Sequence, residues 1–161
     1  MIKQDILENR AKPIYLAIGS NLGNKKNNIE LAKFKLIQND VRITQISSYY
    51  ESLSWPNSNN PKFLNIVLKI TTSLSPIDLL KICKQIEISL GRKKRSKNSP
   101  RECDIDIIDF KNKKMKGHII LPHPRMHARN FVLLPLYELN KAWKHPMSKN
   151  HIKKLIFCFG Q

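Results

Sequence analysis

Hydrophobic residues along this chain recur with two periods, one typical of strands and one typical of helices. Short apolar or β-branched runs, which predict strands, lie at residues 14–18, 42–51, 63–70 and 105–110. Apolar positions at helical spacing lie at residues 25–38 and 76–90. The pattern therefore predicts the order strand, helix, strand, strand, helix, strand.

Local signals place the ends of these elements. Residues 19–24 form a cluster of turn-forming residues directly after the first strand. Ser75 is a good N-cap residue, Pro76 suits the first helical position, and Gly91 can end the same helix. Residues 52–61 form a loop too long and irregular for a tight hairpin, and long loops inside compact domains are often functional.

Smaller elements follow the last predicted strand. We expect a hairpin around residues 111–114 that returns through 118–121, and then a helical segment up to Leu139 that Pro135 kinks or delays. A last short helix is expected within residues 149–159. The whole pattern predicts an α/β (α+β) fold: a ferredoxin-like βαββαβ antiparallel sheet with helices packed on it, plus the hairpin and C-terminal helices.

The length of 161 residues suits one domain with its own hydrophobic core. We expect an N-terminal extension over residues 1–12 and a single domain over residues 13–161. The extension lacks the apolar segment of a secretory signal, and no run approaches the roughly 20 apolar residues of a membrane span. The 3 cysteines are far apart, which suits buried thiols better than a disulfide framework. We expect a cytoplasmic monomer that does not bind a membrane.

The formal net charge is +17, and the isoelectric point is about 10.0. Such a balance favours polyanionic partners, which include nucleic acid, acidic lipid and nucleotide. Lysine far outnumbers arginine, so part of the charge reflects composition bias rather than a binding surface. Charge alone does not choose among these partners.

A basic loop, residues 91–101, leads into two acidic residues at the start of the last strand. Asp104 and Asp106 point to the same face because strand side chains alternate. Neighbouring carboxylates repel unless a cation lies between them, and Mg²⁺ favours sites with one or two carboxylates plus substrate phosphates. The same spacing also occurs on solvated strand faces without any function. Combined with the basic loop, the pair indicates a site for a metal and a polyphosphate.

Two other functions compete with this one. RNA recognition motifs share the predicted element order, but the third strand lacks their Gly-aromatic-x-aromatic signature, and Asp104 and Asp106 would repel a phosphate backbone. A metal-storage site could use His123 and His127, although Pro124 and the basic neighbours disfavour it, and solvated histidines are the ordinary case. We therefore expect small-molecule substrates and no nucleic acid.

Several motifs in order give a more specific indication. They are Ala-Ile-Gly-Ser-Asn-Leu-Gly at 17–23, Phe-Leu-Asn at 63–65, residues 87–92, Pro-Arg-x-x-Asp-Ile-Asp-Ile at 100–107, and Pro-His-Pro-Arg-Met at 122–126 continued by residues 129–131. In these motifs the chain resembles the 6-hydroxymethyl-7,8-dihydropterin pyrophosphokinases, and the match covers nearly everything after residue 12. The resemblance implies a ferredoxin-like enzyme that transfers pyrophosphate from ATP to the hydroxymethyl group of the pterin, releasing AMP in folate biosynthesis.

The resemblance also implies roles for individual residues. Asp104 and Asp106 would hold two Mg²⁺ ions that bridge ATP and the pterin hydroxyl, while Arg92 and Arg101 would contact the phosphates. Residues implied on the pterin side are Phe63 and Phe131 on the two faces of the ring, Asn65 at its polar edge, and Ser52 and Leu53 through their backbone. Residues implied on the nucleotide side are Glu87, Ile107, His123 and Arg129, with Arg92 and Arg101. This scheme needs no protein nucleophile.

The sequence departs from the family pattern in three places. Residues 97–101 replace the usual Arg-Trp-Gly-Pro-Arg in a loop one residue shorter, which leaves Arg95 or Lys97 to supply the missing charge. Trp55 stands where a smaller apolar residue is common, and Pro124 follows the histidine where an aromatic residue is frequent. These changes concern loop closure and rate more than the reaction itself.

Overall fold

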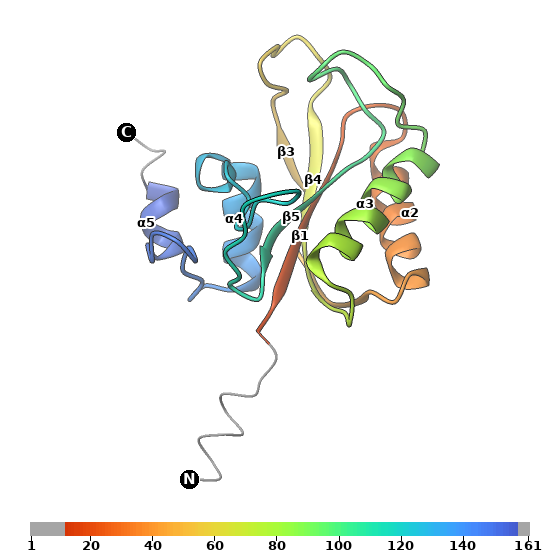
Figure 1. The fold of residues 1–161 in the computed structure, drawn as a ribbon. Coiled ribbons are helices and arrows are strands. Elements are labelled where there is room, and N and C mark those ends of the chain that lie inside the picture. The colour runs from red at the N-terminus through yellow and green to blue at the C-terminus, as the bar shows by residue number, and fades with distance from the viewer. Residues whose placement is uncertain (1–11, 158–161) are drawn as a thin grey trace, which may run out of the picture.

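The structure is a computed structural model, and it describes residues 12–157 (Figure 1). Residues 1–11 of the predicted extension, and the last residues of the predicted C-terminal segment, lie outside the described part. The antiparallel sheet consists of β1 (Ile14–Ser20), β2 (Arg42–Ile46), β3 (Tyr50–Ser52), β4 (Phe63–Thr71) and β5 (Asp104–Phe110). The strand order is β2-β4-β1-β5, with β3 also paired to β4. This arrangement confirms the predicted ferredoxin-like sheet.

The two faces of the central strand β1 bury different cores. Ile14, Leu16 and Ile18 alternate along one face and pack against helices α2 (Lys25–Gln38) and α3 (Pro76–Ser89). Tyr15 points to the other face and packs with residues of α4 (Asn130–Leu139) and α5 (Ile152–Phe157). Figure 1 shows the two helix pairs on opposite sides of the sheet.

Capping explains where the second long helix begins. The Ser75 hydroxyl accepts a hydrogen bond from the backbone N–H of Asp78 at 3.1 Å, and Pro76 occupies the first turn. The chain leaves the helix through Gly91, whose φ of +108° suits glycine. This end of the helix brings the basic loop to the start of β5.

The predicted strand over residues 42–51 is wrong, because it is two strands, β2 and β3. Ser47, which lies between them, is buried. Its backbone N–H donates to the Val67 carbonyl at 3.0 Å, and its hydroxyl accepts from the Val67 N–H at 2.9 Å. One serine thus bonds both backbone groups of a single β4 residue, which interrupts the regular pairing.

Two later predictions also need correction. Lys111 and Asn112 form the expected turn, with φ of 54° and 58°, but the return is only an isolated bridge between Met115 and Leu121. Pro135 does not delay α4, because the helix already begins at Asn130 and continues through the proline. A short 3₁₀ turn, Met126–Ala128, precedes α4. Within residues 12–157, no helix is long and apolar enough to cross a membrane.

Candidate active site

The end of β1 and the starts of β4 and β5 meet at one edge of the sheet, and small residues there form the floor of a cleft. Gly19 lies between Asn65 of β4 and Asp104 of β5, and Ala17 lies beside Asp106. The cavity above them has a volume of about 1040 Å³. Larger side chains on β1 would fill this space, so the cleft depends on two small residues of the central strand.

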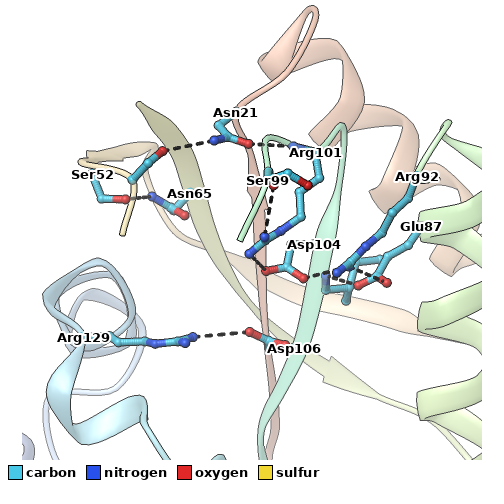
Figure 2. A network of polar contacts seen from close by, with 12 residues as sticks. Asn21, Ser52, Asn65, Glu87, Arg92, Ser99, Arg101, Asp104, Asp106 and Arg129 are labelled. Carbon is cyan, nitrogen blue, oxygen red and sulfur yellow. Dashed lines mark hydrogen bonds and ion pairs between the residues drawn. The ribbon is translucent and has the colours of Figure 1, made fainter. Parts of the chain in front are cut away.

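Asp104 is held by two arginines from opposite ends of the basic loop. Arg92 reaches one carboxylate oxygen at 3.0 Å and Arg101 reaches the other at 2.9 Å, as Figure 2 shows. Burial alone would raise the pKa of Asp104, but the charges of Arg101 and Arg92 outweigh it and hold that pKa below its ordinary value. Asp104 is therefore ionised at neutral pH.

Asp106 stands two residues further along the same face and has weaker partners. Arg129 lies 3.5 Å from its carboxylate, and His123 lies 3.7 Å away. Burial, together with the negative charge of Asp104, raises the pKa of Asp106 to about 6. Asp106 is thus the carboxylate of the pair whose ionised form a cation in the cleft would stabilise further.

His123 is neutral and has a defined tautomer. Burial, with the charges of Arg129 and Arg125, lowers the pKa of His123 to about 4. Its Nδ1 accepts a hydrogen bond from the Arg125 backbone N–H at 3.2 Å, so the single ring proton is on Nε2, the atom that faces Asp106. The imidazole can therefore only donate a hydrogen bond into the cleft, through its Nε2–H group.

Glu87 supports the site from below. Its side chain is 2% exposed and accepts from the Ile105 backbone N–H at 2.8 Å, which fixes the start of β5 to α3. The same carboxylate lies 2.7 Å from Arg92 and 3.3 Å from Lys84. Glu87 thus orients Arg92 toward Asp104.

Residues of β3 and β4 line another part of the cleft. The Asn65 amide donates to the Ser52 hydroxyl at 2.9 Å and to the Tyr50 carbonyl at 3.2 Å, which leaves its oxygen toward the cavity floor near Gly19. The Arg101 guanidinium lies over the ring of Phe63, 5.2 Å from its centroid. Arg129 lies over the ring of Phe131, another residue that lines the cavity, at 5.6 Å. Two aromatic rings and a polar amide therefore line the same cavity, a composition that suits a flat heteroaromatic ligand.

Most of the predicted site residues line this one cavity. They are Ser52, Leu53, Phe63, Asn65, Glu87, Arg92, Arg101, Asp104, Asp106, His123, Arg129 and Phe131. Ile107 is the exception, since its side chain is buried in the core that faces α2 and α3. The basic loop also lines the cavity along its whole length from Arg92 to Arg101.

Sequence reasoning missed the role of Asn21, which is 2% exposed. Its amide nitrogen donates to the Ser54 hydroxyl and to the Pro61 carbonyl, each at 3.1 Å. Its amide oxygen accepts from the Arg101 N–H at 2.9 Å, and its own N–H donates to the Arg101 carbonyl at 3.1 Å. One side chain after β1 thus joins the loop at 53–61 to the end of the basic loop (Figure 2). The signal was its place in the motif at 17–23, which indicated only a turn.

The donor chemistry fits Mg²⁺. Asp104 and Asp106 offer carboxylate oxygens on one face of a strand, at the floor of an arginine-lined cleft. Among residues 12–157, no group of three or more His, Cys, Asp or Glu residues could form an all-protein metal site. The other ligands would therefore have to come from substrate phosphates and water, which is the arrangement Mg²⁺ favours.

Comparison with known proteins gives consistent matches. A model of the family described as 7,8-dihydro-6-hydroxymethylpterin-pyrophosphokinase (HPPK) matches residues 15–141. A 2-amino-4-hydroxy-6-hydroxymethyldihydropteridine pyrophosphokinase from Aquifex aeolicus (strain VF5) is 38% identical over 142 residues, which are 88% of this chain and 88% of the relative. A protein of the same name from Bacillus subtilis (strain 168) is 39% identical over 127 residues, 78% of this chain and 76% of the relative.

Solved structures support the fold. An HPPK-DHPS crystal structure in complex with substrates matches with a TM-score of 0.72 at 15% identity, covering 91% of this chain and 43% of that chain. Wild-type HPPK-DHPS from Plasmodium falciparum matches with a TM-score of 0.69, also at 15% identity, covering 91% of this chain and 44% of that chain. At this identity the likeness concerns the architecture alone.

Proposed function

The chain belongs to the 7,8-dihydro-6-hydroxymethylpterin-pyrophosphokinase family, and from this premise we propose how its cleft performs the reaction. The enzyme transfers pyrophosphate from ATP to 6-hydroxymethyl-7,8-dihydropterin in folate biosynthesis, and it releases AMP. The observation that carries the mechanism is the position of Asp104 and Asp106 on one face of β5, inside a cleft lined by Arg92, Arg101 and Arg129.

The reaction mainly requires positioning and charge neutralisation. The pterin hydroxyl gives up its proton to solvent as its oxygen bonds to the β-phosphorus of ATP, the bond from that phosphorus to the oxygen shared with the α-phosphate breaks, and AMP leaves. Arg92 and Arg101 border Asp104 and are placed to contact the phosphates. Their planar guanidinium groups can bind phosphate oxygens in pairs, which holds the moving group in line.

Asp104 and Asp106 would hold Mg²⁺, which we propose as two ions. When bound, the metal supplies neutralisation of the phosphate charge and orientation of the acceptor hydroxyl. The raised pKa of Asp106 fits this role, because the carboxylate pair is stabilised in its ionised form when positive charge enters the cleft. Neutral His123 adds no positive charge but can donate its Nε2 proton to an oxygen of the ligand.

ATP is assigned to the side of the cleft that α3 and the basic loop line. Arg129 reaches Asp106 from the α4 side of the cleft (Figure 2), and His123 also borders Asp106. Both are proposed to contact ATP, while Glu87 acts from beneath through Arg92. Ile107 can contribute only backbone groups, because its side chain lies in the core. The pterin is assigned to the other side, between the rings of the two cavity-lining phenylalanines. Residues proposed to bind the pterin are Ser52, Leu53, Phe63, Asn65 and Phe131.

We also propose that the domain over residues 13–161 acts as a cytoplasmic monomer. No helix among residues 12–157 is long and apolar enough to span a membrane, and the residues that line the described cleft all belong to a single chain. Light scattering at micromolar concentration measures the molar mass, and a mass of twice 18.8 kDa would contradict the monomer.

The reaction is tested with the purified protein, ATP, Mg²⁺ and 6-hydroxymethyl-7,8-dihydropterin. Chromatography should show AMP and the pterin diphosphate in equal amounts, and AMP should not form when the pterin is omitted. Formation of ADP and a pterin monophosphate would instead identify transfer of a single phosphoryl group and would overturn the proposed arrangement.

A further inference from the structure

Glu102 is the residue that follows the basic loop, and its side chain folds back beneath that loop. Only 20% of the side chain is exposed, and its Oε1 lies 3.5 Å from Arg95 in the middle of the loop. A Cβ added to Gly91 would meet both Oε1 and Cδ of Glu102 at 3.4 Å. These are ordinary van der Waals distances, so the carboxylate of Glu102 lies directly beside the glycine that ends α3.

Arg95 is held by two contacts. Its NH1 group donates to the Pro100 carbonyl at 3.1 Å, and its NH2 group faces Glu102. A guanidinium carries five N–H donors, so these two contacts leave three donors free. Arg95 also lines the cavity, and 36% of its side chain is exposed. The two contacts thus fix one side of the group while another side stays accessible from the cleft.

The lysines of the loop differ from Arg95 in this respect. Lys93, Lys94 and Lys97 are exposed, as Arg95 is, but within residues 12–157 their ammonium groups make no hydrogen bond or ion pair. A flexible, hydrated ammonium group must be ordered when it binds an anion, which costs conformational entropy. The structure therefore separates one arginine whose guanidinium has two partners from three lysines whose ammonium groups have none among residues 12–157.

Glu102 is not explained by stability alone. Its second oxygen, Oε2, is buried, and no donor among residues 12–157 reaches it. Burying an acceptor without a partner is unfavourable, and such groups in folded proteins call for an explanation. An apolar residue would avoid the penalty, but it could not attract a guanidinium.

We propose that Glu102 is a positioning residue, which holds Arg95 so that its free donors face the phosphates of ATP. The inference rests on the proposed function, because it takes ATP as the ligand of the basic loop. Glu102 itself does not touch the substrate and acts through Arg95. The pair compensates for the shorter loop by placing one fixed charge where the loop otherwise offers mobile ones.

The test is a double-mutant cycle measured as affinity for a non-hydrolysable ATP analogue by calorimetric titration with Mg²⁺. Glu102→Gln removes the charge but keeps the size, Arg95→Ala removes the guanidinium, and Glu51→Gln on an exposed position of β3 is the matched control. We expect Glu102→Gln and Arg95→Ala each to weaken binding of the analogue about tenfold. The double variant should bind the analogue as well as Arg95→Ala does. The control should bind as the wild type does.

Three further measurements separate positioning from a structural role. Arg95→Lys keeps the positive charge but loses the planar set of N–H donors of the guanidinium, so it should bind the analogue almost as weakly as Arg95→Ala. The melting temperature and the KM for the pterin should stay unchanged in Glu102→Gln. Additive losses in the double variant, or wild-type analogue affinity in Glu102→Gln, would overturn the inference.

Failure of the proposed function gives a different result. If the wild-type protein forms ADP, or turns over no pterin, the proposed reaction is wrong. The analogue titrations still decide in that case whether Glu102 acts through Arg95. If Glu102→Gln does not fold, the shorter carboxylate in Glu102→Asp replaces it. This variant should retain more analogue affinity than Arg95→Ala, and equal loss would count against the inference.

Discussion

Gly19 of β1 lies directly across the sheet from Asn65 of β4, and a Cβ at position 19 would be 2.9 Å from the Asn65 side-chain oxygen. The same Cβ would be 3.3 Å from the ring of Phe63. In known protein structures a Cβ atom essentially never comes closer than 3.0 Å to such a neighbouring atom. Either the asparagine side chain or the strand would therefore have to move. The glycine therefore gives two proposed pterin-binding side chains their position in the cleft.

Gly19→Ala should damage pterin binding more than ATP binding. Overpacking of this kind costs about 1–3 kcal/mol of folding free energy, and it displaces the Asn65 amide. We expect at least about a tenfold loss of pterin affinity in calorimetric titration, which corresponds to 1.4 kcal/mol. The double variant Gly19→Ala/Asn65→Ala should regain part of the stability but not the affinity. Wild-type pterin affinity in Gly19→Ala would exclude Asn65 as a ligand-binding residue.

Phe131→Ala and Phe63→Leu should keep most of their thermal stability and bind the pterin far more weakly. Both rings line the cavity and neither is fully buried, although Phe131 also packs against the core that faces α4 and α5. Leu133→Ala, a fully buried control on α4, should instead lose about 2–5 kcal/mol of stability. Affinity for the ATP analogue alone should change little in either aromatic variant. Unchanged pterin affinity with a collapsed melting temperature would return both phenylalanines to a structural role.

Arg101→Ala should slow the reaction much more than Lys94→Ala. Arg101 is fixed by its ion pair with Asp104 and by the backbone bonds to Asn21, whereas Lys94 is exposed in the middle of the loop. Loss of a preorganised charge at the reacting group costs roughly 100-fold or more in kcat. Steady-state kinetics at saturating ATP compares the two variants. Equal effects would mean that only the total charge of the loop matters.

Glu138 of α4 should contribute stability that depends on pH. Its carboxylate accepts from the Ser48 N–H, the Ser48 hydroxyl and the Tyr50 hydroxyl, which joins α4 to β3. Burial alone would raise the pKa of Glu138, but these hydrogen bonds outweigh it and hold that pKa below its ordinary value. Because the folded-state pKa is the lower one, the stabilisation is complete above the unfolded value and disappears as the pH falls through the folded value.

Urea unfolding of the wild type and of Glu138→Gln measures this contribution. At pH 7 the variant should be less stable by roughly 1 kcal/mol or less, since the group is largely exposed. The difference should shrink when the pH falls below the ordinary glutamate value of about 4.3. A difference that stays constant with pH would show that the carboxylate charge has no part in joining α4 to β3.

Periodicity and cap signals predicted most of the fold because they depend on local chemistry. The alternation in β5 placed Asp104 and Asp106 on one face, and Ser75, Pro76 and Gly91 placed the ends of α3. Those features require no knowledge of distant residues. The motifs then brought most of the site residues to one cleft.

The features that sequence reasoning missed depend on partners far away in the chain. Ser47 interrupts a strand because it bonds to Val67, 20 residues later. Asn21 stabilises the cleft through Ser54 and Arg101, which are 33 and 80 positions away. A local pattern cannot distinguish such residues from ordinary turn formers, because only the folded chain brings their partners together.

The most direct test of the mechanism is the turnover of Asp106→Asn, measured as AMP formation from ATP, Mg²⁺ and the pterin. Asp40→Asn, at an exposed turn with φ of +61° that asparagine tolerates, is the control. We predict that Asp106→Asn loses about 1,000-fold or more in kcat with an unchanged melting temperature, because the lost charge weakens the hold on Mg²⁺ and the phosphates. AMP formation by Asp106→Asn at the rate of the wild type and of Asp40→Asn would contradict the account.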